Sequence, residues 1–282
     1  MAVTTLTAPA RRAISSGTED VRPTRRRLGP GKPIRFGGLI GIAALLAAWV
    51  VGSATGLLDP RTLTEPWTVV ATAETLIENG RLQESLVTSG IRAALGLGLG
   101  VAVGLVLALV SGLSRVGETL IDGPIQVKRS IPTLALIPLL ILWLGIGEPM
   151  KVITIALAVF VPIYIHTHNG LRTIEGRYAE LAETLGVSRT EFIRHVVLPG
   201  AMPGFLLGLR FAVTSSLLAL VVVEVINATS GIGHMITLAS SYGQTDIIVV
   251  GLVVYALLGV SADAVVRLIE RKALSWRRTL AS

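Results

Sequence analysis

Ionisable side chains interrupt the apolar blocks of this chain at only a few positions. Arg210 and Glu224 fall in one block, and Asp263 and Arg267 fall in another. A charge inside the hydrocarbon of a membrane is costly unless it meets a partner or a water-filled cavity, so these residues are candidates for a solute pathway. Asp263 and Arg267 stand four residues apart, which favours an internal ion pair on one helix face. Arg210 and Glu224 are fourteen residues apart, so they do not pair within one helix.

Each pathway candidate in the first block has two interpretations. Arg210 lies near one end of the block, where it either extends its guanidinium to the membrane surface or guides an anion. Glu224 and Asn227 lie near the other end, where they either line an entrance or hold a loop in place. The sequence leaves both alternatives open.

Other kinds of chemistry are not indicated. His166 and His168 are two residues apart, which puts them on different faces of a helix, and no acidic cluster accompanies them, so no metal site is predicted. The chain has no cysteine, no H-E-x-x-H or G-x-S-x-G motif and no G-x-x-x-x-G-K-[ST] phosphate-binding loop. We therefore predict no catalytic residue, no bound cofactor and no ATP hydrolysis by this chain.

Composition indicates an integral membrane protein. Hydrophobic residues make up 51% of the 282 residues and charged residues only 15%, against about 25% in soluble domains. The mean hydropathy is +0.70. The net charge of +7 comes mainly from the two ends of the chain, beside apolar blocks. Basic residues in such places usually meet anionic headgroups, so membrane lipid is favoured as a partner over nucleic acid.

The stretch 173–199 is polar, lies between two apolar blocks and carries dense local signals. Apolar residues recur over its first half with the period of an amphipathic helix, and Gly186 then predicts a left-handed C-terminal cap. Ser188 and Glu191 have the S-x-x-E spacing of a capping box, which predicts a second helix. We expect that helix to end by Pro199, because proline disfavours helical geometry in the residue before it.

This stretch resembles the EAA loop of ABC-importer permeases, whose pattern is Glu-Ala-Ala, three residues, Gly, nine residues, Ile, one residue, Leu-Pro. Leu181 replaces the first alanine of the pattern, and Val196 replaces the isoleucine. The segment from Pro132 to Glu148 is similar to that of the nitrate, taurine and aliphatic-sulfonate branch of these permeases. The residues that the resemblance assigns to an ATPase-coupling loop are Glu180, Ala182, Gly186, Val196, Leu198 and Pro199.

The resemblance implies an all-α membrane protein with six transmembrane helices, the type I ABC importer transmembrane-domain fold, assembled as a homodimer. Its coupling loop is expected to dock into a groove of a separate ATP-binding subunit, present in two copies, which binds ATP and magnesium. Glu180 is expected to make a charge contact, and Gly186 to allow the sharp turn. An extracytoplasmic solute-binding protein completes the implied assembly.

Hydropathy places six spans in a permease domain at 37–272, most of them near the roughly 20 residues that a bilayer requires. A basic arm, 1–36, precedes this domain and is expected to be disordered and cytoplasmic. A cytoplasmic tail, 273–282, follows it. Pro132 and Pro138 predict a kinked third span that lines the pathway. The predicted spans are about 36–58, 91–111, 125–145, 150–169, 203–226 and 246–268.

Several connections also carry signals. An amphipathic piece at 66–77 predicts an external surface helix, and 227–245 is expected to be a glycine-containing loop. Pro203 is expected in the first turn of the fifth span, where its missing N–H is not needed. Three glycines at intervals of four, Gly96, Gly100 and Gly104, predict close helix packing in the second span.

Charge distribution predicts the orientation. Lysine and arginine gather in the arm, the coupling loop and the C-terminal flank. The opposite side has only Arg61, Arg81 and Lys151, with Arg92 ambiguous. Because short cytoplasmic segments carry the excess of basic residues, both termini and the coupling loop are predicted to be cytoplasmic. The expected location is the bacterial cytoplasmic membrane, which the chain crosses several times.

The function expected from these features is import of a small solute by alternating access, driven by ATP hydrolysis in the partner. The branch resemblance implies a sulfonate, taurine or a nitrate-like anion, although similar permeases handle bicarbonate, an aromatic acid or a pyrimidine vitamin precursor. Two other classes remain as alternatives. An ion-coupled secondary transporter would rely on Asp263, and a membrane-embedded enzyme would need convergent catalytic groups.

Overall fold

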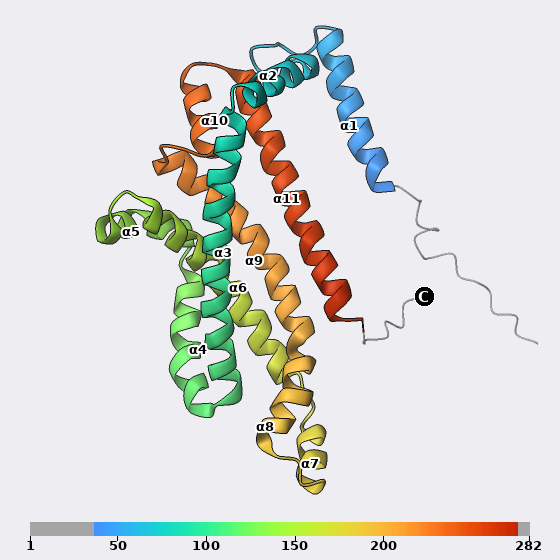
Figure 1. Cartoon of the computed structure of the whole chain (residues 1–282), viewed down its shortest axis with the longest axis vertical. Coiled ribbons are helices and arrows are strands. Elements are labelled where there is room, and N and C mark those ends of the chain that lie inside the picture. Colours follow the sequence, from blue (N-terminus) through green and yellow to red (C-terminus); the bar gives the residue numbers. More distant parts are fainter. Residues whose placement is uncertain (1–36, 276–282) are drawn as a thin grey trace, which may run out of the picture. The chain divides into compact units, whose positions relative to one another are not determined.

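The computed structural model describes residues 37–275, which form helices joined by short turns, with no strand among them (Figure 1). The predicted arm 1–36 and most of the predicted tail 273–282 lie outside these residues. The chain divides into two compact units, 1–46 and 47–282, and the boundary falls inside α1 (Gly37–Ala54). The prediction of an all-helical fold is confirmed for the part of the chain that the structure describes.

Four helices are long and apolar enough to cross a membrane by length and composition: α3 (Arg81–Leu113), α6 (Glu148–Arg172), α9 (Leu198–Asn227) with the turns before it, and α11 (Thr245–Ala273). The predicted spans 91–111, 150–169, 203–226 and 246–268 each lie inside one of them. A bent pair makes a fifth candidate, and α1 is a shorter apolar helix.

The bent pair corresponds to the predicted kinked span. Its first arm is α4 (Arg115–Ser130), and its second arm consists of η1 (Thr133–Leu136) and α5 (Ile137–Leu144), at 90° to the first. The break lies at Ile131 and Pro132, so the kink is confirmed. Lys128 fixes the corner, because its Nζ donates to the Thr133 hydroxyl at 2.7 Å and to the Leu157 carbonyl of α6 at 2.8 Å. Both predicted prolines of this span, Pro132 and Pro138, are exposed.

The core of the larger unit consists of α3, α6 and α9, with α6 packed along both of the others. Glycines allow the close approach of α3 and α6. A Cβ at Gly100 would lie 2.6 Å from the Val159 Cβ and 2.7 Å from the Ala156 carbonyl. Gly96 and Gly104 make similar approaches, so the predicted packing role of these glycines is confirmed.

Glycines bring α6 and α9 together in the same way. A Cβ at Gly204 would lie 2.6 Å from the His166 carbonyl oxygen and 2.9 Å from the Gly170 Cα. Fully buried aliphatic side chains, including Ile163 and Leu220, fill the space between the helices farther along. The three helices therefore form one closely packed body.

The expectation that the helix after Ser188 ends by Pro199 is wrong. The helix continues from α8 (Arg189–Phe192) through a π-helical turn, η2 (Ile193–Val197), into α9 without a break. The Leu198 N–H bonds to the Ile193 carbonyl, five residues back. This wider turn gives the Pro199 ring room against the preceding carbonyls, which would be crowded in a regular α-helix.

Two further expectations need correction. Pro203 lies inside α9 rather than in its first turn, because the helix begins earlier and has Pro199 in that position. The segment 227–245, expected to be a loop, contains the helix α10 (Ile232–Ser241). Its glycines sit at the ends of that helix and in its first turn. The predicted surface helix is present as α2 (Pro66–Glu78), which packs on α11 and α3.

We predict that Gly100→Ala destabilises the protein by about 1–3 kcal/mol, because the added methyl overlaps the Val159 side chain and the α6 backbone. Gly98→Ala is the matched control, since nothing lies within 4 Å of a Cβ there and alanine favours a helix. Thermal unfolding in detergent measures both changes. Equal unfolding midpoints for the two variants would contradict this account of the α3–α6 contact.

Candidate functional site

A helix–glycine–helix unit stands at one end of the α3–α6–α9 body. Its first helix is α7 (Gly176–Thr184), and Gly186 follows with φ of +67°. The Gly186 N–H donates to the Glu183 carbonyl at 3.1 Å, and the Val187 N–H donates to the Ala182 carbonyl at 2.9 Å. These bonds close the helix end in the predicted left-handed cap, in a conformation that favours glycine.

The second helix of the unit begins with the predicted capping box. The Glu191 N–H donates to the Ser188 hydroxyl at 3.3 Å, and the Ser188 N–H donates to a Glu191 carboxylate oxygen at 3.2 Å. Val187 precedes the N-cap and Phe192 follows in the first turn, and both line the groove between the two helices. Local sequence signals therefore set the geometry of this unit in full.

The groove between α7 and α8 has a volume of about 420 Å³. Ala182 and Val196 line it, and Leu185, also in its wall, is 69% exposed. Glu180 lies exposed on α7, and Leu198 and Pro199 follow at the start of α9. Glu180, Ala182 and Gly186 thus lie in this unit, and Val196, Leu198 and Pro199 lie in the continuous helix that follows it. The unit presents apolar side chains and carboxylates together on its surface. This combination suits a protein partner.

A buried charge network lies at the other end of α9. Glu224 of α9 has no exposed surface, and its carboxylate accepts hydrogen bonds from four donors. These donors come from three other helices: Ser89 Oγ of α3 at 2.7 Å, Arg92 Nη1 of α3 at 2.7 Å, Gly233 N of α10 at 3.0 Å and Tyr255 OH of α11 at 2.8 Å. The carboxylate therefore ties four helices together.

Arg92 extends the network to α6. Its side chain is 2% exposed, and its guanidinium makes a bidentate pair with Glu148, with both N–O distances at 2.6 Å. It also donates to the backbone and hydroxyl oxygens of Ser230, so all five of its N–H groups have acceptors. Lys151, 3% exposed, donates to Glu148 at 2.9 Å. Two cations thus balance two carboxylates, as buried charges require.

Glycine makes room for this network. Gly231 has φ of +105°, and a Cβ there would collide with the Glu224 carboxylate and lie 2.7 Å from Arg92 Nη1. A Cβ at Gly233 would lie 2.5 Å from the Glu224 Cβ. The two glycines allow the start of α10 to reach the charges with its backbone.

Sequence reasoning found Glu224 but missed its partners. Arg92 was left ambiguous, and Lys151 was assigned to an external flank, although each lies inside a helix long enough to span a membrane. Burying a charge inside the membrane is as costly for these two cations as for Glu224. Asn227, also a candidate, ends α9, and its buried side-chain nitrogen has no hydrogen-bond partner among the described residues.

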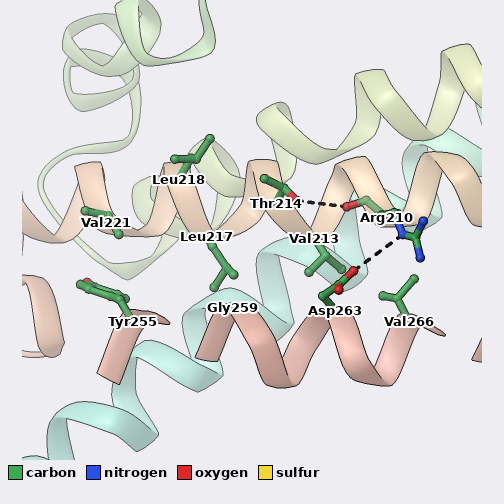
Figure 2. A pocket seen from close by; sticks show the side chains of 10 residues that line it. All are labelled: Arg210, Val213, Thr214, Leu217, Leu218, Val221, Tyr255, Gly259, Asp263 and Val266. Atoms are coloured by element: carbon green, nitrogen blue, oxygen red, sulfur yellow. Dashed lines mark hydrogen bonds and ion pairs between the residues drawn. The ribbon is translucent and has the colours of Figure 1, made fainter. Parts of the chain in front are cut away.

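Arg210 lies at one end of a groove of about 320 Å³ between α9 and α11 (Figure 2). Its Nε lies 3.7 Å from Asp263, and its Nη2 lies 3.3 Å from Glu270. The predicted pair of Asp263 and Arg267 is present, with an N–O distance of 2.7 Å. Tyr255, which bonds to Glu224, lines the far end of the groove. The groove therefore separates the polar cluster of Arg210 from that of Glu224.

Several long apolar helices that bury a balanced charge network indicate a multi-pass membrane protein. The chain belongs to the family described as binding-protein-dependent transport system inner membrane component, which matches residues 100–275.

Named relatives agree with this family. The permease SsuC of Escherichia coli (strain K12), named for aliphatic sulfonate transport, is 44% identical over 82% of this chain and 88% of its own length. SsuC of Bacillus subtilis (strain 168) is 38% identical over 92% of each chain. The taurine transport system permease TauC of Escherichia coli (strain K12) is 31% identical over 83% of this chain and 87% of its own.

A solved structure shows the same fold. An amino acid ABC transporter crystallised with histidines matches at a TM-score of 0.59 and 18% identity, over 71% of this chain and 97% of its own.

We predict that Arg92→Met destabilises the protein by about 3–5 kcal/mol, because it leaves the Glu224 carboxylate buried without its cation. Arg92→Met combined with Glu224→Met is expected to cost less than the sum of the single changes, since it removes both charges. Thermal unfolding in detergent measures the cycle. The exposed Arg81→Met is the control. Additive losses in the cycle would show that the two charges are not coupled.

Proposed function

We propose that this chain is the permease subunit of an ATP-driven ABC importer. Two copies are expected to form a homodimer that works with two copies of an ATP-binding subunit and an extracytoplasmic solute-binding protein. The observation that carries the proposal is the α7–Gly186–α8 unit, whose caps and spacing reproduce the EAA-loop pattern while its apolar side chains stay exposed. The family match supports this assignment.

In this proposal the chain crosses the bacterial cytoplasmic membrane six times, with α1 as the first span and the bent pair as the third. Lysine and arginine are in excess in the arm, the α7–Gly186–α8 coupling unit and the C-terminal flank. This excess supports placing both termini in the cytoplasm. The coupling unit then faces the cytoplasm. The Glu224 network, at the opposite end of α9, faces the outer side of the membrane.

Coupling is proposed to act through the continuous helix that begins at α8. A helix of the unit docks into the ATP-binding subunit by its apolar face and polar rim, a common mode of helix recognition. Residues 189–227 form one helix of 39 residues. At 1.5 Å per residue it is about 58 Å long, enough to carry a tilt from the docking site across the bilayer. ATP and magnesium are expected to bind only to the partner.

The solute is proposed to be a small sulfonate, such as an alkanesulfonate or taurine. The names of the two SsuC relatives and of TauC support this choice. Pro132, Pro138, Arg210 and Asn227 remain our candidates for the pathway. Of the two roles considered for Glu224, its burial favours holding the chain after α9 in place, through the start of α10.

We predict that Glu180→Ala and Gly186→Asp abolish co-purification of the ATP-binding subunit in detergent, while the permease still inserts. The first removes the proposed charge contact, and the second puts a side chain where φ is +67°. Gly176→Ala is the control, since its Cβ would meet nothing within 4 Å. If the wild-type permease captures no ATPase while folded, the importer assignment is wrong.

We predict that proteoliposomes containing the permease, its ATPase and the binding protein take up radiolabelled ethanesulfonate or taurine only when ATP is inside with the ATPase. Bicarbonate and nitrate serve as competitors. If nitrate or bicarbonate inhibits the uptake and alkanesulfonates do not, the sulfonate assignment is wrong. Uptake that follows an ion gradient without ATP would favour a secondary transporter.

A further inference from the structure

The Glu224 network is the place where the periphery of the bundle is attached to its core. The core helices α3, α6 and α9 also pack closely through glycines, so the charges are not their only contact. By contrast, the start of α10 reaches the core through polar bonds. The Ile232 N–H donates to Ser89 Oγ at 2.9 Å, and the Gly233 N–H donates to Glu224 at 3.0 Å.

Helix α11 is attached to α9 by polar contacts at two places. At the end near α10, Tyr255 donates to Glu224 at 2.8 Å. At the other end, Arg210 pairs with Asp263 and Glu270. Between them lies the groove of about 320 Å³, walled by residues such as Leu217 and Gly259 (Figure 2). Along this groove the side chains of α9 and α11 leave space between them, whereas α11 packs on α10 and α2 through apolar residues such as Val250 and Met235. The polar contacts at the two ends therefore contribute much of the attachment of α11 to α9 itself.

Only one member of the charge network is widely open to solvent. Glu148 has a side chain that is 56% exposed, while those of Arg92 and Lys151 are 2% and 3% exposed. Arg92 therefore connects the exposed Glu148 to Glu224, and Glu224 in turn contacts α10 and α11.

We propose that Ser89, Arg92, Glu224 and Tyr255 are positioning residues for the transport cycle. They hold α10 and α11 at fixed positions along α9. Movement of α9 then reaches the outer face of the permease through this network. The inference rests on the proposed function, because it presumes that α9 moves with the ATPase at its other end.

The test uses the complete transporter in lipid nanodiscs, with permease, ATPase and solute-binding protein. Tyr255→Phe and Ser89→Ala each remove one hydroxyl from the network and nothing else. Tyr242→Phe is the matched control, since Tyr242 is 73% exposed at the end of α10. Two quantities are measured: the stimulation of ATPase activity by solute-loaded binding protein, and the solute moved per ATP in proteoliposomes.

We expect Tyr255→Phe and Ser89→Ala to lower the stimulation ratio by about threefold or more, because each loses a hydrogen bond to a charged group. Solute moved per ATP is expected to fall as well, and the ATPase still co-purifies. The control keeps both values. Unchanged stimulation and unchanged solute per ATP, with only a lower unfolding midpoint, would overturn the proposal and leave the network a purely structural feature.

A second measurement does not depend on the ATPase. The chain has no cysteine, so spin labels attach only at introduced sites such as Val87→Cys in α3 and Ser240→Cys in α10. We expect the distribution of distances between the two labels to broaden in Tyr255→Phe and Ser89→Ala but not in Tyr242→Phe. If the distance distributions are equally wide in all variants, the positioning role is contradicted. This outcome is independent of whether the wild-type permease binds an ATPase, which tests the importer assignment.

Discussion

The arrangement at the Glu224 end depends on one constraint, the presence of a guanidinium and a carboxylate inside an apolar bundle. Either charge alone would be severely destabilising there. Arg92 and Glu224 are accordingly hydrogen-bonded by two serines, a tyrosine and the backbone of α10. The course of the chain after α9, including the left-handed Gly231, follows from this requirement.

The rest of the larger unit relies on a different kind of contact. Small residues let α3, α6 and α9 approach until backbone meets side chain, as at Gly100 and Gly204. Such packing is rigid because it leaves little space to rearrange. A rigid three-helix body with a docking unit at one end and a polar attachment at the other is suited to passing on movement as a whole.

The sequence was sufficient where a signal and its consequence are close together along the chain. The cap at Gly186, the Ser188 and Glu191 capping box and the long apolar helices depend on nearby residues, and all were predicted. The charge network was not, because Arg92 and Glu224 are 132 residues apart and their pairing depends on how helices pack. The prediction that the helix ends by Pro199 failed for a related reason, since the π turn that accommodates this proline has no strong local signal.

The exposed groove between α7 and α8 has a consequence for the cell. A copy of the proposed permease made without its partner presents Leu181 and Leu185, 55% and 69% exposed, to the cytoplasm. In the proposed assembly the ATP-binding subunit would cover these side chains, so a permease copy without that subunit would keep an apolar patch open to non-specific association.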